Sequence, residues 1–366
     1  MNEPRTIADI PTPALVVDVR ILDRNIGQMA RFFSARACKL RPHFKAHKTP
    51  EIARRQLAAG ACTGLTCATA LEAEVAASFS DDILIANEIV GAANCGRVAA
   101  LAGRTTMTVA VDSAVALDGI SAAAREAGVT IGALVDLNVG QNRCGVEPGD
   151  DAVALGRLVA AAPGITLRGL MGYEGHAVGI GDRAEREAAV RTSMQRLLST
   201  KRMFDQAGLP TGIVSAGGTG SYDISGELEG ITEIQAGSYA LMDTDYGRLG
   251  LPFEHALFVL GTVVSRSVLE RCVADCGHKS CTKDHGHPSV WNIPGASVLA
   301  LNDEHATIAL PPASPLRIGD RLRLLPSHID PTMNLHDVVY AIEGDAVVGV
   351  WPIAARGYRQ ALGARA

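Results

Sequence analysis

The stretch Arg41-Pro42-His43-Phe44-Lys45-Ala46-His47-Lys48 brings a lysine to the end of a short apolar segment. The residues 37–42 run into this lysine, which is expected to stand at the end of a strand. Arg41, Lys48 and two histidines crowd Lys45 in the sequence. An amine held among other cations at a strand end is a candidate for Schiff base formation with an aldehyde. The alternative is a solvated basic loop, and residues further along the chain decide between the two.

The composition is that of an ordinary globular enzyme. The chain has 366 residues, of which 47% are apolar and 20% charged, enough for a large core and two domains. A net charge of -5 and a pI near 6.1 argue against nucleic acid or an anionic membrane as the main partner. Residues 1–5 lack the apolar core of a signal peptide, and no apolar run approaches about 20 residues. We therefore expect a soluble cytoplasmic protein that acts on a small molecule.

Between residues 12 and 250, short β-branched runs alternate with Ala-rich amphipathic stretches. The predicted strands are 14–17, 40–44, 64–68, 83–86, 106–111, 131–137, 167–172, 212–214 and 233–236. The predicted helices include 50–59, 69–77, 115–126, 150–162 and 183–207. Strands separated by helices indicate parallel βαβ units, and eight such units close into a barrel of about 250 residues. An open doubly wound sheet is less well supported, because no G-x-G-x-x-G follows the first strand.

After about residue 255 the pattern changes to short strands joined by turns, with little helical periodicity. The predicted strands are 260–264, 273–274, 306–310, 321–325, 338–342 and 346–351. The sequence thus predicts an α/β protein in which a TIM-like (β/α)8 barrel covers residues 12–250. Residues 1–11 and 251–366 are expected to form a second domain of β-strands.

Residues suited to chemistry follow the predicted barrel strands, where the active sites of such barrels lie. The segment 135–145 (Val-Asp-Leu-Asn-Val-Gly-Gln-Asn-Arg-Cys-Gly) places Arg143 in a loop, and 171–176 (Met-Gly-Tyr-Glu-Gly-His) ends the next strand. Two glycine-rich turns follow, at 215–221 and 235–239. Two such loops after late barrel strands make a phosphate cradle. Together with the strand-end lysine they indicate a phosphorylated aldehyde held at both ends, and pyridoxal 5′-phosphate (PLP) fits this description.

The β-strand region offers one candidate metal site, in Pro326-Ser327-His328-Ile329-Asp330-Pro331-Thr332. In an extended segment residues i and i+2 project to the same side, so His328 and Asp330 could bind one divalent cation. A nitrogen and a carboxylate with open positions suit Mn²⁺, Co²⁺ or Mg²⁺ that keeps several waters. The alternative is that Asp330 opens a turn before Pro331 while His328 is an ordinary surface residue.

Taken together, these motifs resemble the fold-type III PLP enzymes of the D-threonine aldolase and D-serine dehydratase family. The resemblance runs from residues 11–15 to 351–357 and rests on the motifs quoted above, in order, together with 327–337 (Ser-His-Ile-Asp-Pro-Thr-Met-Asn-Leu-His-Asp). It implies an alanine racemase-type barrel that binds PLP, a D-serine dehydratase-like β domain that carries the metal, and a homodimer.

The resemblance also implies roles for matched residues. Lys45 would carry the Schiff base, Arg143 would contact the phenolic oxygen of the cofactor or steer the lysine, and Tyr173 would lie near the pyridine nitrogen. Gly218, Thr219, Gly237 and Ser238 would bind the phosphate, with Tyr239 as a further candidate, and Ser215 would belong to the same cofactor site. His328 and Asp330 would bind the metal, expected to be Mn²⁺, with Co²⁺, Mg²⁺ and Zn²⁺ as alternatives. A metal-bound hydroxide or a histidine (His43, His47 or His176) would accept a proton from the substrate.

The metal pair bears on the reaction. In this family the dehydratases favour His-x-Cys and the aldolases His-x-Asp, so Asp330 implies a lyase that cleaves D-β-hydroxy-α-amino acids to glycine and an aldehyde. The alternatives are a 3-hydroxy-D-aspartate aldolase and a dehydratase of D-serine or 3-hydroxy-D-aspartate, which releases a keto acid and ammonia. A racemase needs no metal, and non-catalytic PLP-binding proteins usually lack the β domain. Segments 173–176 and 275–280 depart from the aldolase pattern, which leaves the substrate side chain open.

Overall fold

The computed structural model describes residues 4–358, which form two compact units. The barrel unit comprises Met29–Lys45 and Ala53–Gly237. The β-rich unit comprises residues 4–28, Ala46–Ile52 and residues 238–358. The two units are therefore interleaved along the chain, and one of the crossings follows directly on Lys45.

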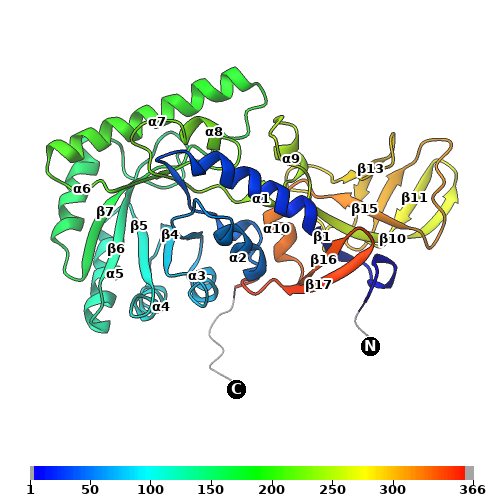
Figure 1. Cartoon of the computed structure of the whole chain (residues 1–366), viewed down its shortest axis with the longest axis horizontal. Coiled ribbons are helices and arrows are strands. Elements are labelled where there is room, and N and C mark those ends of the chain that lie inside the picture. Colours follow the sequence, from blue (N-terminus) through cyan, green and yellow to red (C-terminus); the bar gives the residue numbers. More distant parts are fainter. Residues whose placement is uncertain (1–3, 359–366) are drawn as a thin grey trace. The chain divides into compact units, whose positions relative to one another are not determined.

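A parallel sheet of eight strands forms the barrel unit, in the order β2-β9-β8-β7-β6-β5-β4-β3. Figure 1 labels β4, β5, β6 and β7, which lie side by side. The strands are β2 (Lys39–Leu40), β3 (Leu65–Cys67), β4 (Asp82–Glu88), β5 (Thr106–Val111), β6 (Ile131–Asp136), β7 (Ile165–Met171), β8 (Ile213–Ala216) and β9 (Glu233–Ile234). Parallel bridges from Leu40 to Cys62 and from His43 to Thr66 link the two edge strands. Hydrogen bonds thus run around the whole ring, and the predicted α/β class and TIM-like barrel are confirmed.

Helices connect the strands of the barrel unit. They are α1 (Val19–Ser34), α2 (Pro50–Ala58), α3 (Ala70–Ala76), α4 (Ala92–Ala102), α5 (Ala114–Ala127), α6 (Asp150–Ala161), α7 (Arg183–Gln206) and α8 (Tyr222–Ser225). All five predicted helices are present, with ends within one residue of those expected. Local capping explains this agreement: Thr69 accepts a backbone N–H at the start of α3, and Gly128, at φ +65°, ends α5 in the left-handed conformation. Within residues 4–358, no helix combines the length and apolar character needed to cross a membrane.

Apolar residues at matching positions of neighbouring strands make one cluster of the barrel core. Leu84 of β4, Ala110 of β5, Leu134 of β6 and Met171 of β7 pack together, all nearly inaccessible to solvent. Strands of a parallel sheet are covered on both faces, which is why these segments are almost continuously apolar in the sequence.

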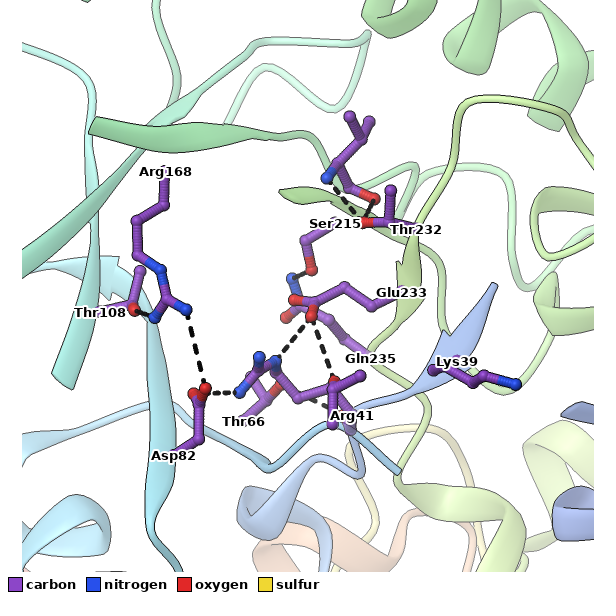
Figure 2. A network of polar contacts seen from close by, with 12 residues as sticks. Lys39, Arg41, Thr66, Asp82, Thr108, Arg168, Ser215, Thr232, Glu233 and Gln235 are labelled. Atoms are coloured by element: carbon purple, nitrogen blue, oxygen red, sulfur yellow. Dashed lines mark hydrogen bonds and ion pairs between the residues drawn. The ribbon is translucent and has the colours of Figure 1, made fainter. Parts of the chain in front are cut away.

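Charged side chains fill another level of the barrel interior (Figure 2). Arg41, whose side chain is 3% exposed, donates from Nε to Glu233 Oε2 (2.9 Å) and from Nη1 to Asp82 Oδ1 (2.8 Å). Arg168 Nη1 donates to Thr108 Oγ1 (2.7 Å), and its Nη2 lies 3.8 Å from Asp82 Oδ2. This network joins the segment after β2 to β4, β5, β7 and β9.

The β-rich unit contains a mixed sheet with the order β13-β14-β11-β10-β1-β16-β17, in which β15 pairs with β10 and β12. The strands are β1 (Ala14–Asp18), β10 (Leu257–Val268), β11 (Arg271–Ala274), β12 (Ser289–Val290), β13 (Ser297–Leu301), β14 (Ala306–Ala309), β15 (Arg321–Leu325), β16 (Val338–Glu343) and β17 (Ala346–Pro352). Two short helices, α9 (Thr244–Gly247) and α10 (Ile329–Asn334), belong to the same unit. The six predicted strands after residue 255 are all present, whereas β12 and β13 were not predicted.

The prediction for the first strand, 14–17, was wrong in its placement. It was expected to begin the parallel series, but β1 pairs antiparallel with β10, with Ala14 opposite Leu260, and parallel with β16, with Leu15 opposite Val339. Its apolar residues are buried on both faces, as they would be in a barrel strand. A continuous apolar run therefore identifies a central strand without saying which sheet contains it.

The buried guanidinium of Arg41 gives a test of the interior network. Arg41→Met leaves the buried carboxylate of Glu233 without its cation and Asp82 with only the more distant Arg168. We therefore expect the free energy of unfolding to fall by about 3–5 kcal/mol. Urea denaturation followed by circular dichroism measures this. The control is Arg20→Met, because Arg20 and Glu343 form an exposed pair (3.4 Å) worth about 1 kcal/mol or less. Equal, small losses in both variants would contradict the role given to Arg41.

Candidate active site

Lys45 lies in a single 3₁₀ turn, Phe44–Ala46, just beyond the carboxyl end of β2. The turn is fixed by its neighbours: His43 N–H donates to Ala236 O (3.1 Å), and Lys45 N–H donates to His43 Nδ1 (3.4 Å). The buried ring of Phe44 packs edge-on against Phe79, with centroids 6.1 Å apart. The half-buried lysine therefore stands at the rim of the barrel, where the sequence predicted it.

Arg143 and Tyr173 come together at the same rim. Arg143 is in the exposed loop after β6, and its guanidinium carbon is 5.7 Å from the centroid of the Tyr173 ring, which follows β7. His176, three residues further on, is exposed, and its Nε2 lies 3.5 Å from Ser193 Oγ of α7. The structure thus brings Arg143 and Tyr173 together and places His176 beside α7.

Carboxyl groups form a cluster below Arg143. Asp136 ends β6, is 8% exposed, and lines a small cleft together with Arg143 and Tyr173. Burial raises the pKa of Asp136 well above its usual value, and the neighbouring carboxylates of Glu88 and Asp112 raise it further. Protonation of Asp136 is therefore favoured relative to that of a solvent-exposed aspartate. The sequence analysis missed this cluster, although all three acids stand at or just after the ends of consecutive strands.

Glu174 organises the first glycine-rich loop. Its fully buried carboxylate accepts hydrogen bonds from the N–H of Gly217 (3.1 Å) and from the hydroxyls of Ser221 (2.7 Å) and Ser225 (2.6 Å). Ser221 Oγ in turn accepts from the N–H of Gly218 (3.2 Å). The sequence left open whether Glu174 serves a polar substrate or is an ordinary hydrogen-bonded residue. It could not identify these partners, because they lie more than 40 residues away.

The same loop has the shape expected of a phosphate cradle. Gly217 has a φ of +76°, and a Cβ there would lie 2.7 Å from Ile234. A Cβ at Gly218 would lie 3.2 Å from the Tyr173 ring, so a side chain would crowd the space between loop and ring. Thr219 follows, nearly fully buried. This backbone and the lysine on the same rim fit a phosphorylated aldehyde such as PLP.

The remaining residues predicted for the cofactor site lie in different surroundings. Ser215 is inside β8, and its hydroxyl accepts a hydrogen bond from Gln235 Nε2 (2.8 Å). Gly237 ends the barrel unit, and Ser238 begins a 3₁₀ turn of the β-rich unit. Tyr239 in that turn is fully buried, with its ring 5.6 Å from that of Phe253.

His328 and Asp330 meet in the β-rich unit, but not for the reason predicted. His328 is extended, whereas Asp330 lies in the first turn of α10. The segment is therefore not a strand with both side chains on one side. The start of the helix nevertheless brings His328 Nε2 to 3.7 Å from Asp330 Oδ2. One cation with ligand distances of about 2.1 Å can bridge that gap, so the pair fits a divalent metal.

Two further residues beside His328 were not predicted as part of this site. Asp284 Oδ2 is 2.7 Å from His328 Nδ1, and the His285 ring stacks on that of His328 with centroids 4.2 Å apart and an interplanar angle of 8°. Asp284, His285 and His328 form the one three-residue group of potential ligands among residues 4–358. Asp243 accepts the backbone N–H of Ile329 (3.2 Å) and so fixes the start of α10.

Comparison with known proteins agrees with this architecture. The alanine racemase N-terminal domain matches residues 17–245, and a putative serine dehydratase domain matches residues 256–342. D-threonine aldolase of Arthrobacter sp is 39% identical, with the match covering 96% of this chain and 94% of that protein. 3-hydroxy-D-aspartate aldolase of Paracoccus denitrificans is 33% identical, with the match covering 96% of this chain and 93% of that protein. D-threo-3-hydroxyaspartate dehydratase of Delftia sp. is 27% identical, with the match covering 94% of this chain and 98% of that protein. The crystal structure of D-threonine aldolase from Filomicrobium marinum has a TM-score of 0.94 and 38% identity, covering 97% of this chain and 98% of that one.

The raised pKa of Asp136 predicts a specific pH dependence of stability. A carboxyl group whose pKa rises on folding binds more protons in the folded chain, so its burial costs stability increasingly as the pH rises above about 4. Asp136→Asn should therefore raise the free energy of unfolding at neutral pH, and this gain should vanish below about pH 4.

Asp205→Asn is the matched comparison, measured by urea denaturation across the same pH range. Hydrogen bonds from Lys201 and Thr211 lower the pKa of Asp205. Its removal should therefore reduce stability at neutral pH, and the loss should disappear at low pH. A gain from Asp136→Asn that does not change with pH would contradict the prediction.

Proposed function

The chain belongs to the alanine racemase N-terminal domain family, in the fold-type III group that adds a serine dehydratase-like domain, and we propose that it is a D-threonine aldolase-like lyase. It cleaves the Cα–Cβ bond of D-β-hydroxy-α-amino acids to give glycine and an aldehyde, and it depends on PLP and a divalent metal. The full-length similarity to D-threonine aldolase supports this assignment.

The observation that carries the reaction type is the carboxylate of Asp330 beside His328, at 3.7 Å from its Nε2. An imidazole and a carboxylate leave several positions on a hard cation open for a hydroxyl oxygen of the substrate. A dehydratase of 3-hydroxy-D-aspartate is the second candidate, favoured by the similarity to the Delftia enzyme over nearly the whole chain. The two reactions share cofactor and metal but release different products.

Residues at the barrel rim would hold the cofactor. Lys45 would bind its aldehyde carbon, the loop 217–221 its phosphate, and Arg143 with Tyr173 its ring. When bound, PLP would supply the electron sink for the pair released from the Cα–Cβ bond. Tyr173 carries no carboxylate charge, so it does not stabilise a cation on the pyridine nitrogen as an acid would.

His328 and Asp330 would hold the metal, which we propose to be Mn²⁺. A divalent cation there would supply Lewis-acid polarisation of the substrate's β-hydroxyl group. We also propose that the enzyme is cytoplasmic and forms a homodimer. Light scattering of the purified protein would test the homodimer.

A histidine is the proposed acceptor of the hydroxyl proton, and the hydrogen bonds favour His176. His43 Nδ1 accepts the N–H of Lys45 (3.4 Å), so a neutral His43 carries its proton on Nε2 and has no free acceptor there. His47 is fully buried, and its Nδ1 accepts a backbone N–H (3.2 Å). His176 is exposed, and within residues 4–358 its one hydrogen-bond contact is the long one between Nε2 and Ser193 Oγ (3.5 Å).

A product assay tests the reaction type. The purified protein with PLP and Mn²⁺ is given D-threonine, D-serine or 3-hydroxy-D-aspartate, and aldehyde, glycine, keto acid and ammonia are measured. We expect equal amounts of glycine and aldehyde, abolished by EDTA and restored by Mn²⁺. Keto acid and ammonia as the main products would replace the aldolase with the dehydratase. Full turnover after complete removal of metal would refute the metal role.

Replacement of the lysine tests the cofactor site. Lys45→Ala should remove the visible absorbance of the PLP-loaded protein and lower activity by at least about a thousandfold, because the covalent anchor is lost. Lys39→Ala, in β2 before this turn, is the control, since Lys39 Nζ donates to Arg36 O (2.7 Å). A Lys45→Ala protein that keeps the absorbance of the wild type would show that another amine holds the cofactor.

A further inference from the structure

Each ring nitrogen of His328 faces the carboxylate of an aspartate. Its Nδ1 lies 2.7 Å from Asp284 Oδ2, and its Nε2 lies 3.7 Å from Asp330 Oδ2. We propose that Asp284 is a positioning residue, which fixes the orientation and tautomer of His328 so that Nε2 faces the metal. The inference rests on the proposed function, because it assumes that His328 and Asp330 hold a divalent cation.

The hydrogen bond decides which nitrogen is available. An ionised carboxylate can only accept, so Asp284 keeps the proton of a neutral His328 on Nδ1. The lone pair is then on Nε2, on the side of Asp330. A histidine whose remote nitrogen donates to a carboxylate is also a stronger metal ligand, because its ring carries more negative charge.

The surroundings hold the ring in this orientation. His285 lies flat against it, nearly parallel at 4.2 Å, and His285 Nδ1 is itself 3.1 Å from Asp245 Oδ2. Asp284 is anchored by Thr282, whose hydroxyl donates to its Oδ1 (2.7 Å). Rotation of His328 would break the bond to Asp284 and separate two stacked rings.

A competing arrangement uses the same residues. Asp284, His285 and His328 have potential ligand atoms within 4.8 Å of one another, so a metal could lie among them instead of beside Asp330. In that case Asp284 would be a ligand and Asp330 would be dispensable. The bond from Asp284 to His328 favours the positioning role, since it occupies Nδ1 and leaves Nε2 next to Asp330.

The chain offers a matched control in a second histidine–aspartate pair. His278 Nε2 lies 2.8 Å from Asp303 Oδ1 in the same β-rich unit. Within residues 4–358 this pair belongs to no group of three potential ligands. Asp303→Asn therefore removes the same kind of charge from the same kind of pair, without affecting the proposed metal site.

The experiment measures Mn²⁺ binding to the PLP-loaded protein by the loss of the electron paramagnetic resonance signal of free Mn²⁺. A carboxylate that hydrogen-bonds a metal-binding histidine typically contributes about 10- to 100-fold to metal affinity, so Asp284→Asn should weaken binding about tenfold and Asp284→Ala about a hundredfold. Asp303→Asn should bind as the wild type does, and Asp330→Ala should lose the site. Asparagine can still accept from Thr282, so Asp284→Asn preserves the local turn, which circular dichroism verifies.

Two results would overturn the inference, and the first of them leaves the proposed function intact. Wild-type affinity in Asp284→Ala would mean that His328 needs no positioning by this carboxylate. Loss of Mn²⁺ in His285→Ala together with retention in Asp330→Ala would make Asp284 a direct ligand of a different site. A wild-type protein that binds no Mn²⁺ would instead refute both the positioning role and the metal in the proposed function.

Discussion

The position of Lys45 depends on Arg41, four residues earlier in the chain. The guanidinium of Arg41 lies inside the barrel and binds Glu233 of β9 and Asp82 of β4. β2 itself is only two residues long and pairs with β9, so ladder hydrogen bonds alone hold it weakly. The barrel closes between β2 and β3, and the ionic contacts reach β9, the neighbour of β2, and β4, the neighbour of β3. Gly64 fits this arrangement, because a Cβ there would lie 2.7 Å from Arg41 Nη1.

The sequence was sufficient for much of the fold. Helices with a clear cap, such as those begun by Thr69 and Ser113, were predicted to within a residue, because hydrogen bonds between near neighbours fix their ends. β1 was misplaced, because its partners β10 and β16 lie more than 200 residues away and pattern alone does not identify them. α4 was missed, since its start is a glycine with positive φ and its first turn contains no strong helix signal.

The candidate site was predictable only in part, for a similar reason. Lys45, Arg143 and Tyr173 follow strands, so the barrel topology brings them to one rim. His328 and Asp330 were chosen because of their spacing, yet the start of a helix, not an extended strand, brings them together. The bond between Asp284 and His328 spans 44 residues and required the folded chain. Prediction thus succeeded where topology or local spacing determines position and failed where a tertiary contact does.

The interleaving of the two units means that they are not separable modules. The central strand β1 comes from the start of the chain, and both of its partners, β10 and β16, come from the last third. A fragment ending near residue 250 would carry β1 with the fully buried Leu15, Val16 and Val17 but without either partner. It would expose an apolar strand edge of the kind that drives aggregation. Gene fusion or domain exchange at this boundary is therefore disfavoured, and the two halves are expected to be inherited as a single unit.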